Sequence, residues 1–371
     1  MKKSCIILIL VVLSIMVIIT LVQGTVEQAI HPTHELNAID YNTIDMVIPE
    51  SDTLRLQWEK HAGYVPFDFI NFLFQMPQEY DEVMIIVEKA NQHAATFRFG
   101  EGKRSITLME TYPISSGQAH GNKMVRGDLK TPEGLYITTR FRSEANLREA
   151  YGRDALQFGT GAWVLNYPNQ LDRLRLKTGS GIWIHGSDRA MIPFETEGCV
   201  RFDNDVIDYF RDVLNLTRTA VIINDEIDWT TVEALDAEVR RVINLLADWE
   251  ESWRGQDIER YLAFYCREEF ITRRQRMDYT AWANHKQRVF NPDNSVNITF
   301  SEFFYYYGDG LLLVTFYQDY SSGTFSSFGR KQLVLRKTDS SWIIIQEEWL
   351  PATRPRDNRE MMINTGFRNV F

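Results

Sequence analysis

The sequence predicts two folded domains, a mainly β domain with peripheral helices followed by an α+β domain. The length of 371 residues suits two domains of ordinary size. Short runs rich in β-branched and aromatic residues, separated by polar turns that contain glycine, dominate residues 81–225. After residue 232 apolar residues recur at helical spacing, and from residue 296 alternating strands take over. Helices that precede a run of strands are typical of an α+β domain with an antiparallel sheet.

The first 24 residues predict that the chain is exported. Two lysines precede an apolar run from Ile6 to Val22, and Val22-Gln23-Gly24 offers a cleavage site with a small residue. The run is slightly long for a cleaved signal peptide and slightly short for a membrane span, so a signal peptide and an uncleaved membrane anchor both stay open. In either case we expect the remaining chain to work outside the cytoplasm.

The mainly β domain is expected over residues 81–225, after a lead-in region of residues 25–80 that holds a helix or two. Its strands are predicted from apolar runs such as residues 83–87, and its turns from stretches such as Thr131-Pro132-Glu133-Gly134. We expect strands over residues 83–87, 95–99, 105–108, 135–139, 182–184 and 220–223, and one helix over residues 204–214.

The α+β domain is expected over residues 238–350, followed by a C-terminal tail of residues 351–371. Its first helix begins slightly earlier, because Leu245, Trp249 and Trp253 lie at helical spacing opposite a charged face. We expect helices over residues 232–254, 257–265 and 279–289, and strands over residues 296–304, 311–317, 331–336 and 342–347.

Composition and charge narrow the class of protein. Apolar residues make up 44% of the chain and charged residues 24%, which is ordinary for a soluble globular protein and excludes a disordered or polytopic membrane chain. The 40 basic and 50 acidic side chains give a net charge of −10. Because a protein that binds nucleic acid needs a basic surface, we expect no nucleic-acid partner.

His185 and Cys199 form the candidate catalytic pair. Thirteen residues separate them, and each lies beside a glycine, in Ile184-His185-Gly186-Ser187 and in Thr196-Glu197-Gly198-Cys199-Val200-Arg201. A strand that ends in His-Gly and a Gly-Cys turn that opens a helix would let the imidazole take the thiol proton while the sulfur attacks a carbonyl. The start of a helix would also favour the thiolate.

The cysteines leave alternatives open. A lone histidine beside a lone cysteine is more often a matter of packing than of catalysis. Cys266 lies in an apolar segment and is expected to be an inert buried residue. A disulfide between Cys199 and Cys266 is the alternative for these two residues, while Cys5 lies at the start of the N-terminal apolar segment, directly before Ile6.

The motifs around the candidate pair resemble the signature of the L,D-transpeptidase catalytic domain (YkuD-type), in which His-Gly is followed by a Ser/Thr-x-Gly-Cys-x-Arg/Asn block. Residues 130–136 resemble the Thr-Pro-x-Gly strand start of this family, and residues 166–169 and 181–186 resemble its substrate-side turn and catalytic strand. The resemblance covers residues 81–225 and implies a β-sandwich-like fold with peripheral helices. One departure is Glu197, where many members carry a second histidine that is not the base.

The resemblance implies a catalytic role for five residues. Cys199 would be the acyl nucleophile and His185 its base, and Gly186 and Ser187 lie where family members orient the imidazole through a backbone carbonyl. The amides of Gly198 and Cys199 would stabilise the oxyanion.

Four further residues are candidates for binding the substrate. Arg201 would bind the peptide carboxylate. Tyr167 and Trp183 are the aromatic candidates, with packing in the core or the wall of a cleft as their alternative. His120 is a fourth candidate and the alternative base, although a solvated loop histidine is the more common case for its flexible-looking surroundings.

Residues 238–350 resemble an NTF2-like domain, on the pattern Trp249-x3-Trp253-x-Gly-Gln-Asp257-x3-Tyr261 and a sheet that ends in Trp342-x6-Trp349. This α+β fold is a curved sheet around a pocket that serves enzymes, ligand binding and dimerisation alike, so it does not fix a function. The order of the two domains resembles that of the peptidoglycan L,D-carboxypeptidases that set cell shape in helical and curved Gram-negative bacteria, which implies a periplasmic location.

The combined resemblance implies an exported cysteine enzyme that acts on peptidoglycan stem peptides, where Cys199 attacks the carbonyl between diaminopimelate and the terminal D-Ala of a tetrapeptide. Water as acceptor would give an L,D-carboxypeptidase, the activity we favour. An amine would give an L,D-transpeptidase that forms 3–3 crosslinks or attaches proteins to peptidoglycan. A non-catalytic wall- or ligand-binding protein is the second alternative.

The sequence also bears on cofactors and on further partners. No metal or other cofactor is implied, because the seven histidines are scattered without ligand spacing. A homodimer and the ligand of the NTF2-like domain both stay open.

Overall fold

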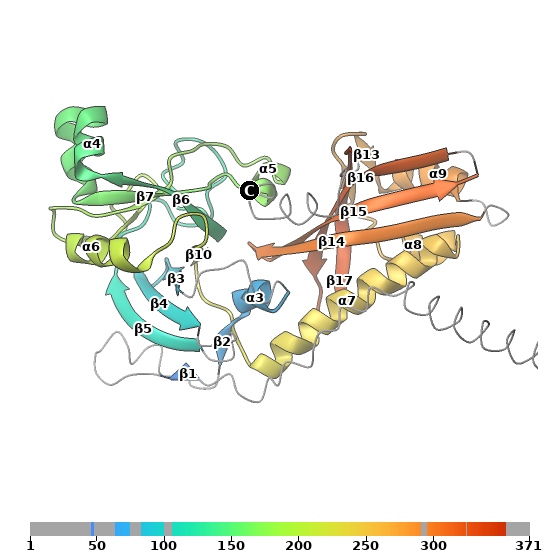
Figure 1. Cartoon of the computed structure of the whole chain (residues 1–371), viewed down its shortest axis with the longest axis horizontal. Helices are drawn as coiled ribbons and strands as arrows, with labels where there is room; N and C mark the ends of the chain where they lie inside the picture. Colours follow the sequence, from blue (N-terminus) through green and yellow to red (C-terminus); the bar gives the residue numbers. More distant parts are fainter. Residues whose placement is uncertain are drawn as a thin grey trace, which may run out of the picture. The chain divides into compact units, whose positions relative to one another are not determined.

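The structure is a computed structural model, which describes residues 46–47, 64–74, 83–99, 106–290, 295–323 and 325–353 (Figure 1). The predicted signal peptide or anchor of residues 1–24 lies outside the described residues, as do most of the lead-in region and most of the C-terminal tail. Within the described ranges, no helix is long and apolar enough to cross a membrane.

The first domain is built on a sheet that joins nine strands of the described chain, in the order β1-β5-β4-β3-β10-β6-β7-β8-β9. These strands are β1 (Met46–Val47), β3 (Val83–Glu88), β4 (His93–Phe99), β5 (Ile106–Pro113), β6 (Gly134–Ser143), β7 (Gly161–Leu165), β8 (Trp183–His185), β9 (Val200–Arg201) and β10 (Ala220–Asn224). Most neighbours run antiparallel, but β1 is parallel to β5, β10 is parallel to β3 and β9 is parallel to β8. All six strands predicted for this domain are present, with ends shifted by a few residues.

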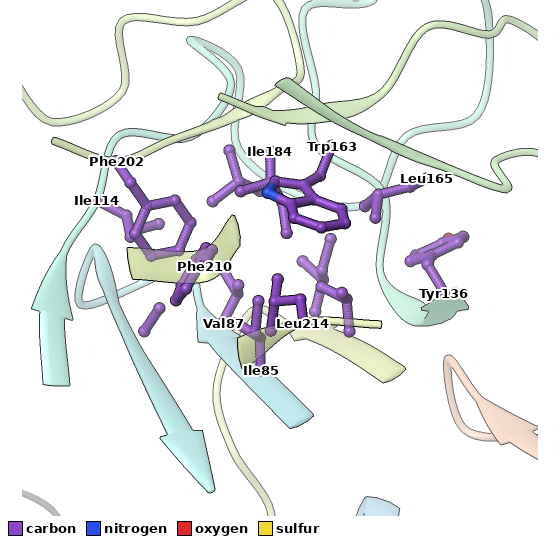
Figure 2. Close-up of a cluster of buried hydrophobic side chains, with 14 of the residues drawn as sticks. Ile85, Val87, Ile114, Tyr136, Trp163, Leu165, Ile184, Phe202, Phe210 and Leu214 are labelled. Atoms are coloured by element: carbon purple, nitrogen blue, oxygen red, sulfur yellow. The ribbon is translucent and has the colours of Figure 1, made fainter. Parts of the chain in front are cut away.

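The sheet curls around one apolar core (Figure 2). Ile85 of β3 and Ile184 of β8 lie in the same buried cluster, although three strands separate β3 from β8 in the sheet. Helix α6 (Asn204–Val213) covers this core with Ile207 and Phe210, both fully buried. Each large apolar side chain buried in this way stabilises the fold by about 1.5–3 kcal/mol. The mainly β, sandwich-like fold with peripheral helices is therefore confirmed.

The first domain has more helical segments than the sequence predicts. Besides α6, it contains α4 (Glu144–Tyr151), the 3₁₀ segment η4 (Gly152–Phe158) and α5 (Gln170–Leu174). In α4 only Leu147 is buried, so the sequence of this helix carries no apolar stripe that could predict it. Helix α5 is short and begins at a reciprocal capping box between Asn169 and Asp172.

The second domain pairs a long helix with a second sheet. The strand order among the described residues is β13-β12-β17-β16-β15-β14. Its elements are α7 (Val232–Arg254), α8 (Ile258–Leu262), β12 (Ile271–Thr272), β13 (Met277–Asp278), α9 (Tyr279–Val289), β14 (Val296–Gly308), β15 (Leu311–Ser322), β16 (Phe325–Lys337) and β17 (Trp342–Pro351). The α+β class is confirmed. The structure gives α7 and α9 their predicted bounds, whereas α8 is shorter than predicted.

Helix α7 forms where its sequence predicts it because both its ends and its buried face are encoded locally. The Thr231 side chain accepts a hydrogen bond from the backbone N–H of Ala234 at its start, and Gly255 follows its last residue. Its apolar stripe packs on β14 and β17, with the Trp249 ring stacked on Phe300 at 5.4 Å between centroids.

Part of the lead-in region packs between the two domains. The segment consists of β2 (Val65–Pro66), the 3₁₀ turn η2 (Phe67–Phe69) and α3 (Ile70–Phe74). Strand β2 pairs with β11 (Trp229–Thr230), and α3 packs against α7 and β14. The Tyr306 hydroxyl of β14 bonds to the first domain, accepting hydrogen bonds from the Asn169 side chain and from the backbone N–H of Leu135.

Candidate active site

Strands β8 and β9 place His185 and Cys199 on the same side of the sheet. In the parallel register, Ile184 lies opposite Val200 and His185 lies opposite Arg201. Side chains alternate along a strand, and Ile184 and Val200 point into the main core. His185, Arg201 and the preceding Cys199 therefore lie on the opposite face, where Cys199 packs in a second apolar cluster.

This face forms a wall of a cavity of about 690 Å³. Five residues that the sequence singled out line it: Trp183, His185, Ser187, Cys199 and Arg201. The loops around these strands contribute further polar and charged lining residues: Gln118, Lys123, Arg126, Gln157, Arg189, Glu195 and Glu197. The two predicted reactive side chains thus share one open cavity of a size suited to a small peptide.

The imidazole of His185 is held in one tautomer. Its Nδ1 lies 2.7 Å from the carbonyl oxygen of Gly186, and because a carbonyl only accepts, Nδ1 carries the proton and Nε2 is left as an acceptor. The Phe158 ring packs against the imidazole at 5.3 Å. Burial lowers the pKa of His185 to about 4. The hydrogen bond to Gly186 raises this pKa, and the positive charge of Arg201 lowers it slightly further. The ring is neutral at physiological pH.

The Cys199 thiol is also neutral. Its Sγ lies 3.5 Å from the carbonyl oxygen of Gly181. Burial raises its pKa to about 11, with a further rise from the charge of Glu197, while a backbone hydrogen bond from Trp183 and the charge of Lys123 act in the opposite direction. The expectation that a helix N-terminus lowers this pKa is wrong, because β9 lies between Cys199 and α6.

The turn before Cys199 is fixed by Thr196. The Thr196 hydroxyl donates to the carbonyl of Cys199 at 2.7 Å and accepts from the backbone N–H of Gly198 at 3.2 Å. Gly198 has φ +128°, and a Cβ there would lie 2.7 Å from the carbonyl oxygen of Lys130, so only glycine fits. The Gly198 amide is thus already bonded, whereas the Cys199 amide has no acceptor in the described part of the chain. This leaves the Cys199 amide as the better candidate oxyanion donor.

Arg201 is bound within the protein. Its guanidinium makes an ion pair of 2.7 Å with Glu195 and donates to the carbonyl of Ala190 at 3.0 Å. The side chain is 6% exposed. A substrate carboxylate would have to share this guanidinium with Glu195, which sequence patterns could not show.

Two predicted substrate-binding residues lie away from the cavity. Tyr167 packs in the main core against Tyr136, and its hydroxyl donates to the carbonyl of Thr178, which favours its alternative interpretation as a core residue. His120 is exposed, packs against the Phe194 ring at 4.6 Å between centroids and does not line the cavity, which fits its alternative interpretation as a solvated loop histidine. Trp183 does line the cavity, with its ring against Phe158.

Gly186 and Ser187 support the catalytic pair through the backbone next to His185. Gly186 holds the imidazole, as described above. The Ser187 hydroxyl accepts from the backbone N–H of Arg189 and closes a turn in the cavity wall. Sequence reasoning missed the charged lining residues Lys123, Arg126, Arg189 and Glu195, whose only signal was their place in loops near the motifs.

Cys199 and Cys266 are free thiols. Cys266 is buried, as predicted, and the alternative of a Cys199–Cys266 disulfide is not formed. In the part of the chain that the structure describes, no cluster of three or more His, Cys, Asp or Glu side chains could hold a metal ion.

Family models match both domains. Residues 82–223 match the L,D-transpeptidase catalytic domain (YkuD), and residues 241–348 match the Cds6 C-terminal NTF2-like domain. The chain therefore carries an L,D-transpeptidase catalytic domain followed by an NTF2-like domain. The cavity with Cys199 and His185 lies in the first of them.

Two solved structures are similar to this chain over about three quarters of its length. Bd1075 from Bdellovibrio bacteriovorus is 26% identical, with 79% of this chain and 100% of that chain covered and a TM-score of 0.53. The helical cell shape determining protein Pgp2 from Campylobacter jejuni is 24% identical, with 76% and 99% covered and a TM-score of 0.55, which shows the shared fold. No curated protein sequence matches this chain significantly.

Proposed function

We propose that this protein is an exported L,D-carboxypeptidase, which cleaves the bond between diaminopimelate and D-Ala in peptidoglycan tetrapeptides. The observation that carries the proposal is the shared cavity of Cys199 and His185, within a domain that matches the L,D-transpeptidase catalytic domain. Enzymes with this domain form an acyl-enzyme on a cysteine. The proposal therefore assigns Cys199 as nucleophile and His185 as base.

The pKa values of the pair favour a concerted first step. With a thiol pKa near 11 and an imidazole pKa near 4, a free thiolate–imidazolium pair is disfavoured. The proposed step is therefore one in which proton transfer from Cys199 Sγ to His185 Nε2 accompanies formation of the bond between sulfur and the carbonyl carbon. The Cys199 amide donates to the oxygen as it becomes negative. His185 then returns the proton to the leaving amine of D-Ala, and a thioester remains.

The second step decides between two activities. Attack of water on the thioester regenerates the thiol and releases a tripeptide, which is the carboxypeptidase reaction. Attack of an amine instead gives the L,D-transpeptidase products, 3–3 crosslinks or proteins attached to peptidoglycan. We favour water because the two domains occur in the order found in peptidoglycan L,D-carboxypeptidases that set cell shape, and Pgp2 is described as a cell shape determinant.

The proposal extends to location and assembly. An N-terminal segment with two lysines and an apolar run favours export to the periplasm. We further propose that the boundaries fall near residues 81, 225, 238 and 350, and that the NTF2-like domain serves ligand binding or homodimerisation. Light scattering of the purified protein tests the dimer.

The proposed function is tested with the full-length protein in detergent and with diaminopimelate-containing tetrapeptide muropeptides. Wild type is expected to release one D-Ala per peptide, detected by mass spectrometry, and Cys199→Ala is expected to release none. Crosslinked dimers or exchange of D-Ala for another D-amino acid would replace the carboxypeptidase by the transpeptidase. An inactive wild type with a native circular-dichroism spectrum would contradict catalysis and favour a wall-binding protein.

A further inference from the structure

The charged side chains that line the cavity fall into two groups. Six lining residues carry a formal charge, and three of these are paired within the protein. Lys123 binds Asp128 at 2.7 Å, and Arg201 binds Glu195 at 2.7 Å. These paired groups add little net charge to the cavity and are held in place by their partners.

The other three charges have no partner among the described residues. They are the guanidinium groups of Arg126 and Arg189 and the carboxylate of Glu197, and all three side chains are exposed to solvent. Charged groups in water cost little when unpaired, so nothing in the fold requires them. The cavity thus presents one free negative and two free positive groups to a ligand, which suits a ligand that carries an ammonium together with carboxylates.

Glu197 lies beside the nucleophile. It precedes Cys199 by two residues in the turn that Thr196 and Gly198 fix. Its negative charge contributes to the raised pKa of the Cys199 thiol. The carbonyl that reacts with Cys199 belongs to the acyl-donor residue of the substrate. The side chain of that same donor residue starts within two bonds of the reacting carbonyl, in the cavity that Glu197 and Cys199 both line.

We infer that Glu197 is a specificity-determining residue that binds the free ammonium group on the side chain of the acyl-donor residue. This inference rests on the proposed function, because it takes the donor to be acylated on Cys199. Arg126 and Arg189 complement two carboxylates of the substrate, one beside the ammonium group on the same side chain and one on the terminal D-Ala. A side chain that ends in both an ammonium and a carboxylate satisfies both signs of charge.

The test compares two tetrapeptides that end in D-Ala. One has diaminopimelate in the third position, and the other has the same residue with its free amino group replaced by hydrogen. A charge-assisted hydrogen bond predicts that kcat/KM of the wild-type full-length protein is about 10- to 100-fold higher for the first peptide. Glu197→Gln should remove this preference by slowing only the reaction of the amino-bearing peptide.

The matched control is Glu149→Gln, which removes an equally exposed carboxylate of α4 outside the cavity lining and should keep the preference. The inference is overturned if wild type shows no preference or if Glu197→Gln retains it. It is also overturned if Glu197→Gln slows both peptides equally, because a carboxylate that activates water would act on both.

A binding measurement separates failure of this inference from failure of the proposed function. In Cys199→Ala no turnover occurs, and calorimetry gives the Kd of each peptide directly. If wild type releases no D-Ala but the Kd values still differ about tenfold or more and become equal in Cys199→Ala/Glu197→Gln, the proposed function fails and the ammonium site stands. Equal Kd values for both peptides, or no binding of either, overturn the ammonium site.

Discussion

The two domains treat charged side chains in opposite ways. In the catalytic domain, Glu197, Arg126 and Arg189 lie exposed around the cavity and have no ion-pair partner within the described ranges. In the NTF2-like domain, Lys331 and Glu347 form an ion pair in which each side chain is only 3% exposed. The Tyr265 hydroxyl donates a further hydrogen bond to the Glu347 carboxylate.

A third charge shares the buried cluster of the NTF2-like domain. The Lys286 ammonium lies 4.4 Å from the ring centroids of Trp253 and Trp282. Burial alone would raise the pKa of Glu347, but the charges of Lys331 and Lys286 hold it below its usual value. The Glu347 carboxylate is therefore paired with Lys331 and also attracts the Lys286 ammonium whenever that group is protonated.

The comparison distinguishes exposed charges that are available to bind a ligand from buried charges that contribute to the stability of the fold. An exposed charge keeps its hydration and loses little when unpaired, so its removal should affect binding and catalysis rather than stability. A buried charge depends on its partner, so removal of either partner should affect stability first. Four measurements can break or sharpen this distinction.

The largest effect is expected for His185→Asn. The change removes the base, and loss of general-base catalysis should lower kcat/KM for D-Ala release by about 10²–10⁴-fold. In wild type, kcat/KM should fall as the pH falls through about 4, because protonation of His185 removes the acceptor for the thiol proton. His120→Asn, outside the cavity, is the control. An acid limb centred near the ordinary histidine pKa would contradict the neutral buried imidazole.

Glu347→Gln should give the largest loss of stability. It leaves Lys331 and Lys286 buried without a carboxylate, and breaking a buried ion pair costs about 3–5 kcal/mol. Urea denaturation of the variant measures the free energy of unfolding. Glu149→Gln, on the surface, should change it by less than about 0.5 kcal/mol. Similar small losses for both variants would show that the buried cluster is not structural.

The reactivity of Cys199 tests the electrostatics of the cavity. Because its pKa is raised to about 11, the rate of alkylation by iodoacetamide should increase roughly tenfold per pH unit from pH 7 to 10. Peptide mass spectrometry follows Cys199 separately, and buried Cys266 serves as the internal reference. A rate that levels off near pH 8 would reveal an activated thiolate instead.

The smallest effect is expected for the pH dependence of stability through Lys286. Burial lowers its pKa to about 7 in the folded protein, so between pH 7 and 9 the unfolded chain binds more protons and stability rises with pH. Lys286→Met should reduce this rise by up to about 1.4 kcal/mol per pH unit. Burial also lowers the pKa of Lys331, so part of the increase in stability with pH should remain in the Lys286→Met variant. Urea midpoints at pH 7, 8 and 9 measure both slopes, and identical slopes would contradict the assignment.

The sequence predicted the elements whose signals are local. Helix α7 is predicted with its bounds because its cap and its apolar stripe lie within the helix itself. Helix α4 escaped prediction because a single buried residue, Leu147, gives no periodic pattern. Strand bounds shifted for a related reason, since pairing with neighbouring strands extends β14 and β15 beyond their apolar runs.

The sequence motif predicted the reactive residues of the candidate site, but not the contacts around them. The motif places His185 and Cys199 in one cavity, but the partners of each group depend on tertiary contacts. The ion pair of Arg201 with Glu195 and the hydrogen bond of Gly198 to Thr196 arise from turn geometry that no spacing reveals. Likewise, Tyr167 is an aromatic residue near a motif, and only the fold shows that its ring is buried.

The parallel pairing of β3 with β10 has a consequence for the order in which the enzyme is made. Strand β10 is the last strand of the catalytic sheet to be synthesised, and it lies between β3 and β6. Until residues 220–224 emerge, β3 and β6 lack the strand that lies between them, so the two halves of the sheet stay unpaired. His185 and Cys199 belong to the half made of β6, β7, β8 and β9, which joins the rest of the sheet through the last strand to be made.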